Sequence, residues 1–343
     1  MQITNNHNLP KAIYNAIVNK EYSKGEAQYS ATELLQPVQL RALMRLNYAH
    51  ISVDAADSIW SLWGSAVHHI LEQSKAPEVI AEQRWYLKVA GFTIGGMPDV
   101  YDGIQRTIED YKTTSVYKVM KNDIEDWFLQ LNIYKLLLEE AGKPVELLKI
   151  HAILKDWSHK KAREDKEFAE KSGQALTYPQ APIVTIDIPY QRSLDTLLYI
   201  IERIKLHEEA KHLKPHELPY CTPKERWCGE DIYAIYSAEK NYTYRVFEIE
   251  KGKEEEASQK AYEVFYKMKA TGYEIIRREG ESLRCKYFCP VAQFCNQFQE
   301  QKPKVILPDE NKNTEWIFKT PDEKSVYLEK LAKIKDEVKN GEK

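Results

Sequence analysis

The sequence predicts an α/β protein in which a central mixed sheet is flanked by helices. The first observation is an amphipathic helical stretch from about Ala55 to Ser74. The second is a run of three strand-like segments between residues 79 and 114, and the third is a helix near 118–141 followed by a strand at 147–154. This order of helix, strands, helix and strand is typical of a sheet packed by helices.

The composition indicates an ordinary soluble globular protein. With 343 residues, 43% hydrophobic and 29% charged, the chain has the length of about two domains or of one domain with additions. It shows neither an apolar run long enough to span a bilayer nor a charged-then-apolar leader, so we expect a cytoplasmic protein with no membrane partner. The net charge of −3 implies that nucleic acid would be bound by local patches and a metal rather than by bulk charge.

The N-terminal part begins with a polar extension, residues 1–29, that contains one short predicted helix near Leu9–Lys20. Ser30 and Glu33 have the spacing of a capping box, which indicates the start of a helix. Pro37 is expected to interrupt this helix and start another.

The helix predicted near 55–74 carries Gly64, His68 and Glu72 at spacings of four, hence on one face. Its apolar positions are Ile59, Trp60, Trp63, Val67, Ile70 and Leu71. Glycine inside a helix costs about 1 kcal/mol and usually marks the close approach of another element. A buried histidine bonded to a backbone carbonyl is the simplest interpretation of His68, and His69 beside it is expected to lie on the surface.

Three strands are predicted next, at Val79–Val89, Phe92–Tyr101 and Ile104–Thr114, with a turn between the last two. Because side chains alternate along a strand, Asp110 and Lys112 project from one face. Pairing of the second and third strands can bring Asp99 beside Asp110.

Two carboxylates beside an ammonium form an oxygen-rich site for Mg²⁺ or Mn²⁺ and leave a cation to act on a nearby oxyanion or water. This arrangement suits hydrolysis of a phosphodiester. The alternative is that Asp110 and Lys112 are a solvated charge pair, because short motifs often occur by chance.

The helix predicted from Lys118 to Ala141 places Gln130 and Tyr134 on one face. Without a site, Tyr134 would belong to the core and Gln130 would be solvated.

The basic run Lys155–Arg163 could contact a DNA backbone, although a solvated surface is the favoured interpretation. Later elements are predicted as strands at Leu147–Leu154, Ile183–Ile188, Ile232–Tyr236 and Tyr242–Phe247 and helices at Tyr190–Lys211 and Glu255–Ala270.

The sequence has five cysteines, all after residue 220: Cys221, Cys228, Cys285, Cys289 and Cys295. The last three have the spacing C-x3-C-x5-C, which suits a metal-binding loop, and Cys221 or Cys228 would supply a fourth thiolate. An iron–sulfur cluster, a zinc ion and free buried cysteines are the three alternatives.

In combination these motifs resemble the PD-(D/E)XK nucleases of the RecB-like branch, which includes phage exonucleases and the CRISPR-associated four-cysteine nucleases. The resemblance covers roughly residues 30 to 155 and again the C-terminal cysteines. It is carried, in this order, by Gly64-x-x-x-His68, Pro98-Asp99, Asp110-Tyr111-Lys112 and Gln130-x-x-x-Tyr134.

The resemblance implies a role for each matching residue. His68 would supply a nitrogen ligand to the metal, and Asp99 and Asp110 would supply carboxylates. The backbone carbonyl of Tyr111 would join them, and Lys112 would orient the attacking water or stabilise the phosphate. One imidazole among oxygen ligands favours Mn²⁺ over Mg²⁺.

Other positions would support the site. Gln130 and Tyr134 would contact the DNA backbone or hold Lys112. Glu72 and Glu109 are candidates to contact the metal ligands rather than the metal itself. Glu109 has the opposite strand parity to Asp110, so both are not expected at the metal.

For the cysteines the resemblance favours a 4Fe–4S cluster, with zinc as the alternative. The chain departs from the four-cysteine relatives because it has no cysteine before the core and its first gap is three residues rather than two. It resembles a phage subgroup in which a Pro-x-Cys-Thr-Pro-x-x-Arg-Trp element supplies the remaining thiol, which favours Cys221 and leaves Cys228 spare.

We therefore expect an N-terminal extension (1–29), a nuclease core (30–215), a cysteine module (216–300) and a tail with an amphipathic helix (301–343). The resemblance implies a metal-dependent deoxyribonuclease, more an exonuclease in DNA end processing or recombination than a site-specific endonuclease. The alternatives are an overhang-trimming endonuclease and a DNA-end-binding scaffold without turnover. DNA is the expected partner, together with a recombination or annealing protein.

Overall fold

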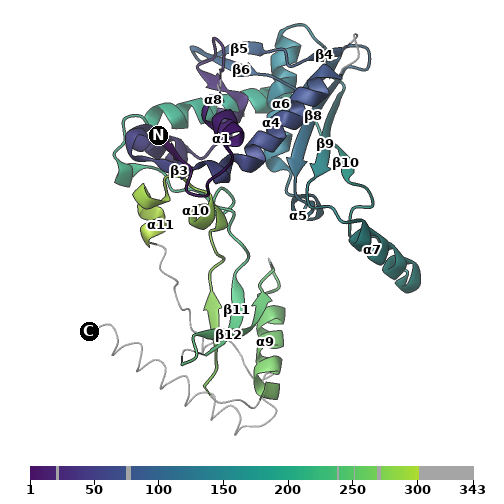
Figure 1. The fold of residues 1–343 in the computed structure, drawn as a ribbon, viewed down its shortest axis with the longest axis vertical. Coiled ribbons are helices and arrows are strands. Elements are labelled where there is room, and N and C mark those ends of the chain that lie inside the picture. The colour runs from purple at the N-terminus through teal and green to yellow at the C-terminus, as the bar shows by residue number, and fades with distance from the viewer. Residues whose placement is uncertain (21–22, 75–78, 238, 251, 269–271, 301–343) are drawn as a thin grey trace. The chain divides into compact units, whose positions relative to one another are not determined.

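The computed structural model describes residues 1–343 except 21–22, 75–78, 238, 251, 269–271 and 301–343 (Figure 1). The chain divides into two compact units, Met1–Tyr220 and a second that begins at Cys221. The amphipathic helix predicted in the tail, with Tyr327 and Leu331, lies outside the described residues.

A five-stranded mixed sheet forms the centre of the first unit. Its strand order is β10-β9-β8-β7-β4, in which β8 and β9 are parallel and the other neighbours antiparallel. The strands span Val79–Ala81 (β4), Val100–Asp102 (β7), Thr107–Thr114 (β8), Leu147–Leu154 (β9) and Ile183–Asp187 (β10). The mixed sheet flanked by helices is thus confirmed (Figure 1).

The parallel pair β8–β9 lies at the centre of the core. Alternate residues of β9, among them Ile150 and Ala152, are fully buried, and they are the register partners of Asp110 and Lys112 on β8. Helix α6 (Glu125–Glu140) packs on the sheet through side chains such as the fully buried Leu131. Burial of apolar surface stabilises a fold by about 25 cal/mol per Å², so the apolar residues fix the strand register. The register in turn fixes the positions of Asp110 and Lys112.

Further helices complete the first unit. One predicted helix, near residues 55–74, begins with a 3₁₀ turn instead of an α-helix. The predicted helix near 55–74 is a 3₁₀ turn, Ala55–Ser58, followed by α4, and the Asp54 side chain accepts a hydrogen bond from Ala56 N. The helices are α1 (Lys11–Val18), α2 (Ala31–Leu34), α3 (Val38–Asn47), α4 (Ile59–Gln73), α5 (Val116–Met120), α7 (His159–Ser172) and α8 (Ser193–Glu209).

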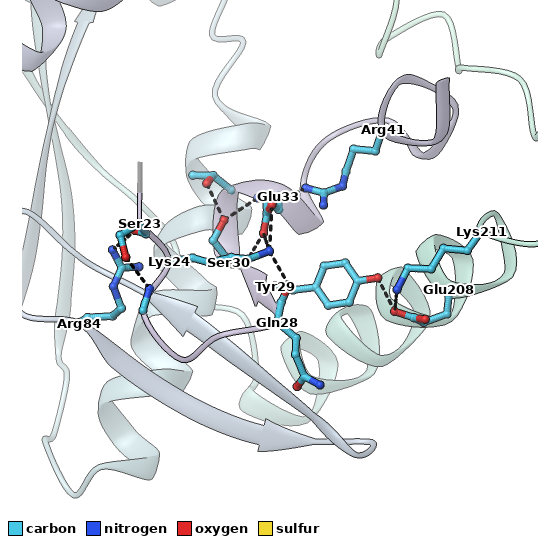
Figure 2. A network of polar contacts seen from close by, with 12 residues as sticks. Ser23, Lys24, Gln28, Tyr29, Ser30, Glu33, Arg41, Arg84, Glu208 and Lys211 are labelled. Atoms are coloured by element: carbon cyan, nitrogen blue, oxygen red, sulfur yellow. Dashed lines mark hydrogen bonds and ion pairs between the residues drawn. The ribbon is translucent and has the colours of Figure 1, made fainter. Parts of the chain in front are cut away.

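The capping box at Ser30 is confirmed (Figure 2). Glu33 N donates to Ser30 Oγ at 3.2 Å, and Ser30 N donates to Glu33 Oε2 at 2.9 Å. Arg41 and Lys24 form ion pairs with Glu33 at 3.1 and 3.3 Å. Helix α2 therefore starts where the sequence indicated, and α3 starts directly after Pro37.

Two of the predicted strands are wrong, because each is divided between two sheets. The stretch 79–89 forms β4 in the five-stranded sheet and β5 (Trp85–Val89) in a second sheet with order β2-β6-β5, in which β2 is Tyr29–Ser30. The stretch 92–101 likewise splits into β6 (Phe92–Gly96) and β7. A Cβ at Gly96 would lie 2.4 Å from Leu137 Cδ1, so the chain leaves the second sheet where a helix crosses it closely.

The long helix predicted from Lys118 to Ala141 is also wrong in its continuity. It consists of α5 and α6, separated at Lys121–Ile124, where Asn122 adopts φ 50°. Left-handed backbone of this kind ends a helix and is tolerated best by glycine and asparagine.

The second unit has a three-stranded antiparallel sheet covered by one helix. Strands β11 (Ile232–Ser237) and β12 (Tyr242–Glu248) and helix α9 (Glu254–Met268) match their predictions, and β13 (Glu274–Arg278) was not predicted. Tyr233, Ile235 and Tyr262 form part of its small core. The cysteine-bearing segments contain α10 (Leu283–Tyr287), a 3₁₀ turn at Ala292–Phe294 and α11 (Asn296–Glu300).

None of the helices in the described part of the chain is long and apolar enough to cross a membrane.

A buried histidine makes the stability of the first unit sensitive to pH. His207 on α8 stacks on Tyr29 with 5.9 Å between ring centroids, and its Nε2 lies 3.5 Å from Arg203 Nη2. Burial and the neighbouring Arg203 and Arg41 lower the pKa of His207 to about 4. Burial, together with the hydrogen bond that Tyr29 Oη donates to Glu208 at 2.6 Å (Figure 2), raises the pKa of Tyr29.

We expect the folded protein to lose stability as the pH falls from about 6.5 to about 4. An unfolded histidine gains its proton near pH 6.5, whereas folded His207 resists protonation until about pH 4, so the loss is on the order of 3 kcal/mol. Urea unfolding of the wild type and of His207→Gln at several pH values measures this. The same pH dependence in both proteins would contradict the assignment.

Candidate functional site

The hairpin of β7 and β8 brings Asp99 and Asp110 together. At its turn, Asp102 Oδ1 accepts hydrogen bonds from Ile104 N and Gln105 N at 2.8 and 2.9 Å, which fixes the register. Val100 is paired with Glu109, so one residue further along the ladder Asp99 lies opposite Asp110. Asp99 itself precedes β7 rather than lying within a strand.

Asp99 is held by two contacts. Tyr111 N donates to Asp99 Oδ2 at 2.7 Å, and His68 Nδ1 lies 3.1 Å from Asp99 Oδ1. His68 reaches this position because α4 lies close against β8: a Cβ added at Gly64 would lie 3.2 Å from Thr113 Oγ1. The bond to Asp99 raises the pKa of His68 against the opposing effect of its burial. The expected convergence of His68 with Asp99 is therefore present, and the glycine has the close approach that its place in the helix indicated.

Asp110 and Lys112 form the second pair of the site. Lys112 Nζ lies 2.5 Å from Asp110 Oδ2, and Asp110 is only 1% exposed. Burial raises the pKa of the Asp110 carboxyl, and the nearby Asp99 adds to this while Lys112 opposes it. Burial opposes the charge on Lys112, but the Asp110 and Asp99 carboxylates outweigh it and raise the pKa of the amine.

The donor set suits a hard divalent cation. Two carboxylates and an imidazole come from three segments, and Asp110 Oδ2 is in contact with the Lys112 ammonium. Within the described residues, however, no three His, Cys, Asp or Glu side chains converge tightly enough to enclose a metal ion as they stand. A cation at Asp110 Oδ2 would replace the contact that Lys112 makes there.

Glu82 is an acidic neighbour that the sequence did not indicate. Its backbone N donates to Asp99 O at 3.1 Å, and its φ is 48°. Burial, with help from Glu72 and Asp99, raises the pKa of its carboxyl. No short motif marks Glu82. The sequence predicts it inside a continuous strand, whereas the chain turns there after β4.

Three of the supporting residues have side-chain partners of their own. Glu109 is on the other face of β8, where its Oε2 lies 3.3 Å from His151 Nε2. Gln130 and Tyr134 are both buried, and Gln130 Nε2 donates to Tyr134 Oη at 2.7 Å. Neither of them therefore offers DNA an exposed surface. Their position follows from α6 lying in the core with most of its length buried.

The neighbouring residues Glu72 and His69 form a pair of their own. Glu72 Oε2 lies 3.8 Å from His69 Nδ1, and the His69 side chain is 68% exposed. His69 thus lies on the surface as expected, and the charge of Glu72 helps to raise the pKa of the Glu82 carboxyl.

All five cysteines lie in the second unit, and none of them is in a disulfide. Cys221, Cys285, Cys289 and Cys295 lie close enough for their charges to affect one another: burial raises the pKa of Cys221 to about 12 and that of Cys285 to about 11, and the other thiols add to both shifts. The fifth thiol, Cys228 Sγ, lies 3.2 Å from Ser282 Oγ.

Two of these cysteines, Cys221 and Cys289, have hydrogen bonds that involve the backbone. Burial raises the pKa of Cys289, and the backbone N–H groups of Val291 and Ala292, which bond to its sulfur, oppose that rise. Gln297 Nε2 donates to Cys221 O and Gln297 Oε1 accepts from Cys221 N, both at 2.9 Å. Sulfur atoms that accept backbone N–H bonds are suited to a metal or a cluster, because such bonds stabilise the thiolate.

Comparison with family models and with curated proteins gives no match. Among solved structures, the chain is similar to a protein designated SSO0001, with a TM-score of 0.39 and 16% identity over 62% of this chain and 91% of that one. It is also similar to a phage-related exonuclease from Haemophilus somnus 129PT, with a TM-score of 0.32 and 14% identity over 62% and 93%.

Replacing Lys112 should destabilise the protein more than replacing Asp110. Lys112→Met leaves a buried carboxylate without its cation, a loss on the order of 3 kcal/mol. In Asp110→Asn the Lys112 side chain, which is 22% exposed, can still reach water. Urea unfolding in EDTA measures both variants and the double variant, which should recover much of the loss. Strictly additive effects would contradict the pairing.

Proposed function

We propose that this chain is a metal-dependent deoxyribonuclease of the PD-(D/E)XK type that hydrolyses DNA phosphodiester bonds from an end. The observation that carries the proposal is the meeting of two charge pairs, His68 with Asp99 and Asp110 with Lys112, across one hairpin and the helix beside it. Acting on DNA ends would place it in end processing or recombination, with an annealing protein as the candidate partner.

His68, Asp99 and Asp110 would hold Mg²⁺ or Mn²⁺. When bound, such an ion lowers the pKa of a water molecule and neutralises charge on the phosphate. Lys112 would keep its charge beside Asp110 and direct it at the phosphate or at the attacking water. Tyr111 fixes the orientation of Asp99 through its backbone N–H, whether or not its carbonyl also reaches the ion.

The cysteines of the second unit would hold a 4Fe–4S cluster, with zinc as the alternative. Cys221, Cys285, Cys289 and Cys295 are the proposed ligands, because their charges act on one another and two of them have ordered backbone contacts. Cys228 also raises the pKa of Cys285, so its charge alone does not separate it from the four. Cys228 is set apart by its contact with Ser282.

Cleavage of an end-labelled linear duplex with Mn²⁺ tests the proposed reaction. Asp110→Ala and Lys112→Ala should each lose about a hundredfold or more of the rate, because each removes charge that acts on the transition state. Lys205→Ala and Glu209→Ala, which break an exposed lysine–carboxylate pair at 3.8 Å on α8, serve as matched controls. Unchanged cleavage in both site variants would refute the assignment.

The form of the substrate separates the proposed exonuclease from its rivals. Covalently closed circular DNA should stay intact while the linear form is degraded. Cutting of the circle would favour an endonuclease. Binding of linear ends without any cleavage would favour a scaffold.

Metal content tests the cysteine assignment. Protein purified without oxygen should contain about four irons and absorb in the visible range. Cys221→Ser should lose the iron and the absorption, and Cys228→Ser should keep both. Zinc in place of iron would rule out the cluster but support a metal site at these cysteines. If Cys228→Ser loses the iron and Cys221→Ser keeps it, Cys228 is the fourth ligand.

A further inference from the structure

Helix α4 exposes two neighbouring tryptophans. Trp60 is 56% and Trp63 49% exposed, and their ring centroids are 5.9 Å apart. Both belong to the apolar positions of this helix, yet no residue of α4 is fully buried. Large exposed aromatic side chains that lie together mark a binding surface more often than isolated ones do.

A lysine covers one of these rings. Lys155 Nζ lies 4.4 Å from the centroid of the Trp60 ring, a cation–π contact. Lys155 follows the last residue of β9, and its backbone N donates to Thr114 O, at the end of β8, at 2.9 Å. The cation is therefore anchored to the strand that carries Asp110 and Lys112. The basic run that begins at Lys155 thus has one member beside the tryptophans.

The tryptophans lie on the helix that also carries the candidate metal ligand. Trp60, Gly64 and His68 follow one another at intervals of four residues, so they share one side of α4. At a rise of 1.5 Å per residue, Trp60 and His68 are separated by roughly 12 Å along the axis. That length corresponds to roughly three nucleotides of a stacked strand, at 3.4 Å each.

We infer that Trp60, Trp63 and Lys155 bind the bases and backbone of single-stranded DNA next to the phosphate that is cleaved. The inference rests on the proposed function and extends it to the form of the substrate. Indole rings stack on the faces of bases without regard to sequence, and a lysine beside them pairs with phosphate. In a duplex those base faces are covered by neighbouring pairs, so the surface fits an unpaired end.

The charge at this surface favours nucleic acid over an apolar protein partner. Lys155 lies against Trp60, and Lys20 Nζ also reaches α4, where it donates to Ser65 Oγ at 2.7 Å. An apolar partner would have to cover both ammonium groups, whereas a phosphate backbone pairs with them.

Equilibrium binding in EDTA tests the inference without any cleavage. Fluorescently labelled oligo(dT) is compared with a strand of the same length in which every base is absent. The wild type should bind oligo(dT) at least about tenfold more tightly than the abasic strand. Trp60→Ala/Trp63→Ala should bind both strands equally, and Trp60→Phe/Trp63→Phe should restore much of the preference.

Two further variants complete the test. Lys155→Ala should reduce the slope of log affinity against log salt by about 0.7, the value for one phosphate of a single strand. Phe168→Ala removes an aromatic ring of α7 that is 58% exposed and should leave the preference for bases unchanged.

The outcomes separate this inference from the proposed activity. If the wild type does not distinguish oligo(dT) from the abasic strand, or if the double alanine variant keeps the preference, the inference is overturned even when the protein cleaves DNA. If oligo(dT) is preferred but Asp110→Ala cleaves like the wild type, the surface stands and the proposed catalytic site fails.

Discussion

The burial of Asp110 beside Lys112 is the constraint on which the rest of the structure depends. A carboxylate at this depth is costly unless a cation accompanies it, and the cation reaches it because both residues lie on one face of β8 between the apolar partners contributed by β9. The parallel β8–β9 pair, the packing of α6 and the close approach of α4 together shape the surroundings of two charged side chains. A core that contains such a pair is less stable than an apolar one, which is typical of a site kept for its chemistry.

Much of this arrangement could be predicted from the sequence. Strand alternation placed Asp110 and Lys112 on one face and Glu109 on the other, and the glycine at position 64 indicated where a helix meets the sheet. These predictions rest on local geometry, which depends little on the remainder of the chain. The capping box at Ser30 is local in the same sense.

The errors occurred where tertiary packing overrides local pattern. Two strand-like runs are each divided between two sheets, and nothing in their alternation shows where the chain changes partners. Asn122 breaks a helix that the apolar pattern would continue. Gln130 and Tyr134 were expected to contact DNA or to hold Lys112; because α6 is buried along most of its length, both are buried and they bond to each other, which leaves no exposed surface for DNA. Glu82 approaches Asp99 only because the chain turns after β4.

The division of the predicted strand 92–101 has a mechanical consequence. Asp99 lies where the chain leaves the β2-β6-β5 sheet and enters the five-stranded sheet, since β6 belongs to the former and β7 to the latter. Its side chain is bound to the five-stranded sheet through Tyr111 N and to helix α4 through His68. If one sheet shifted relative to the other, the Asp99 carboxylate would move with the connection between them. The relative position of the two sheets therefore determines the distance between the carboxylates of Asp99 and Asp110.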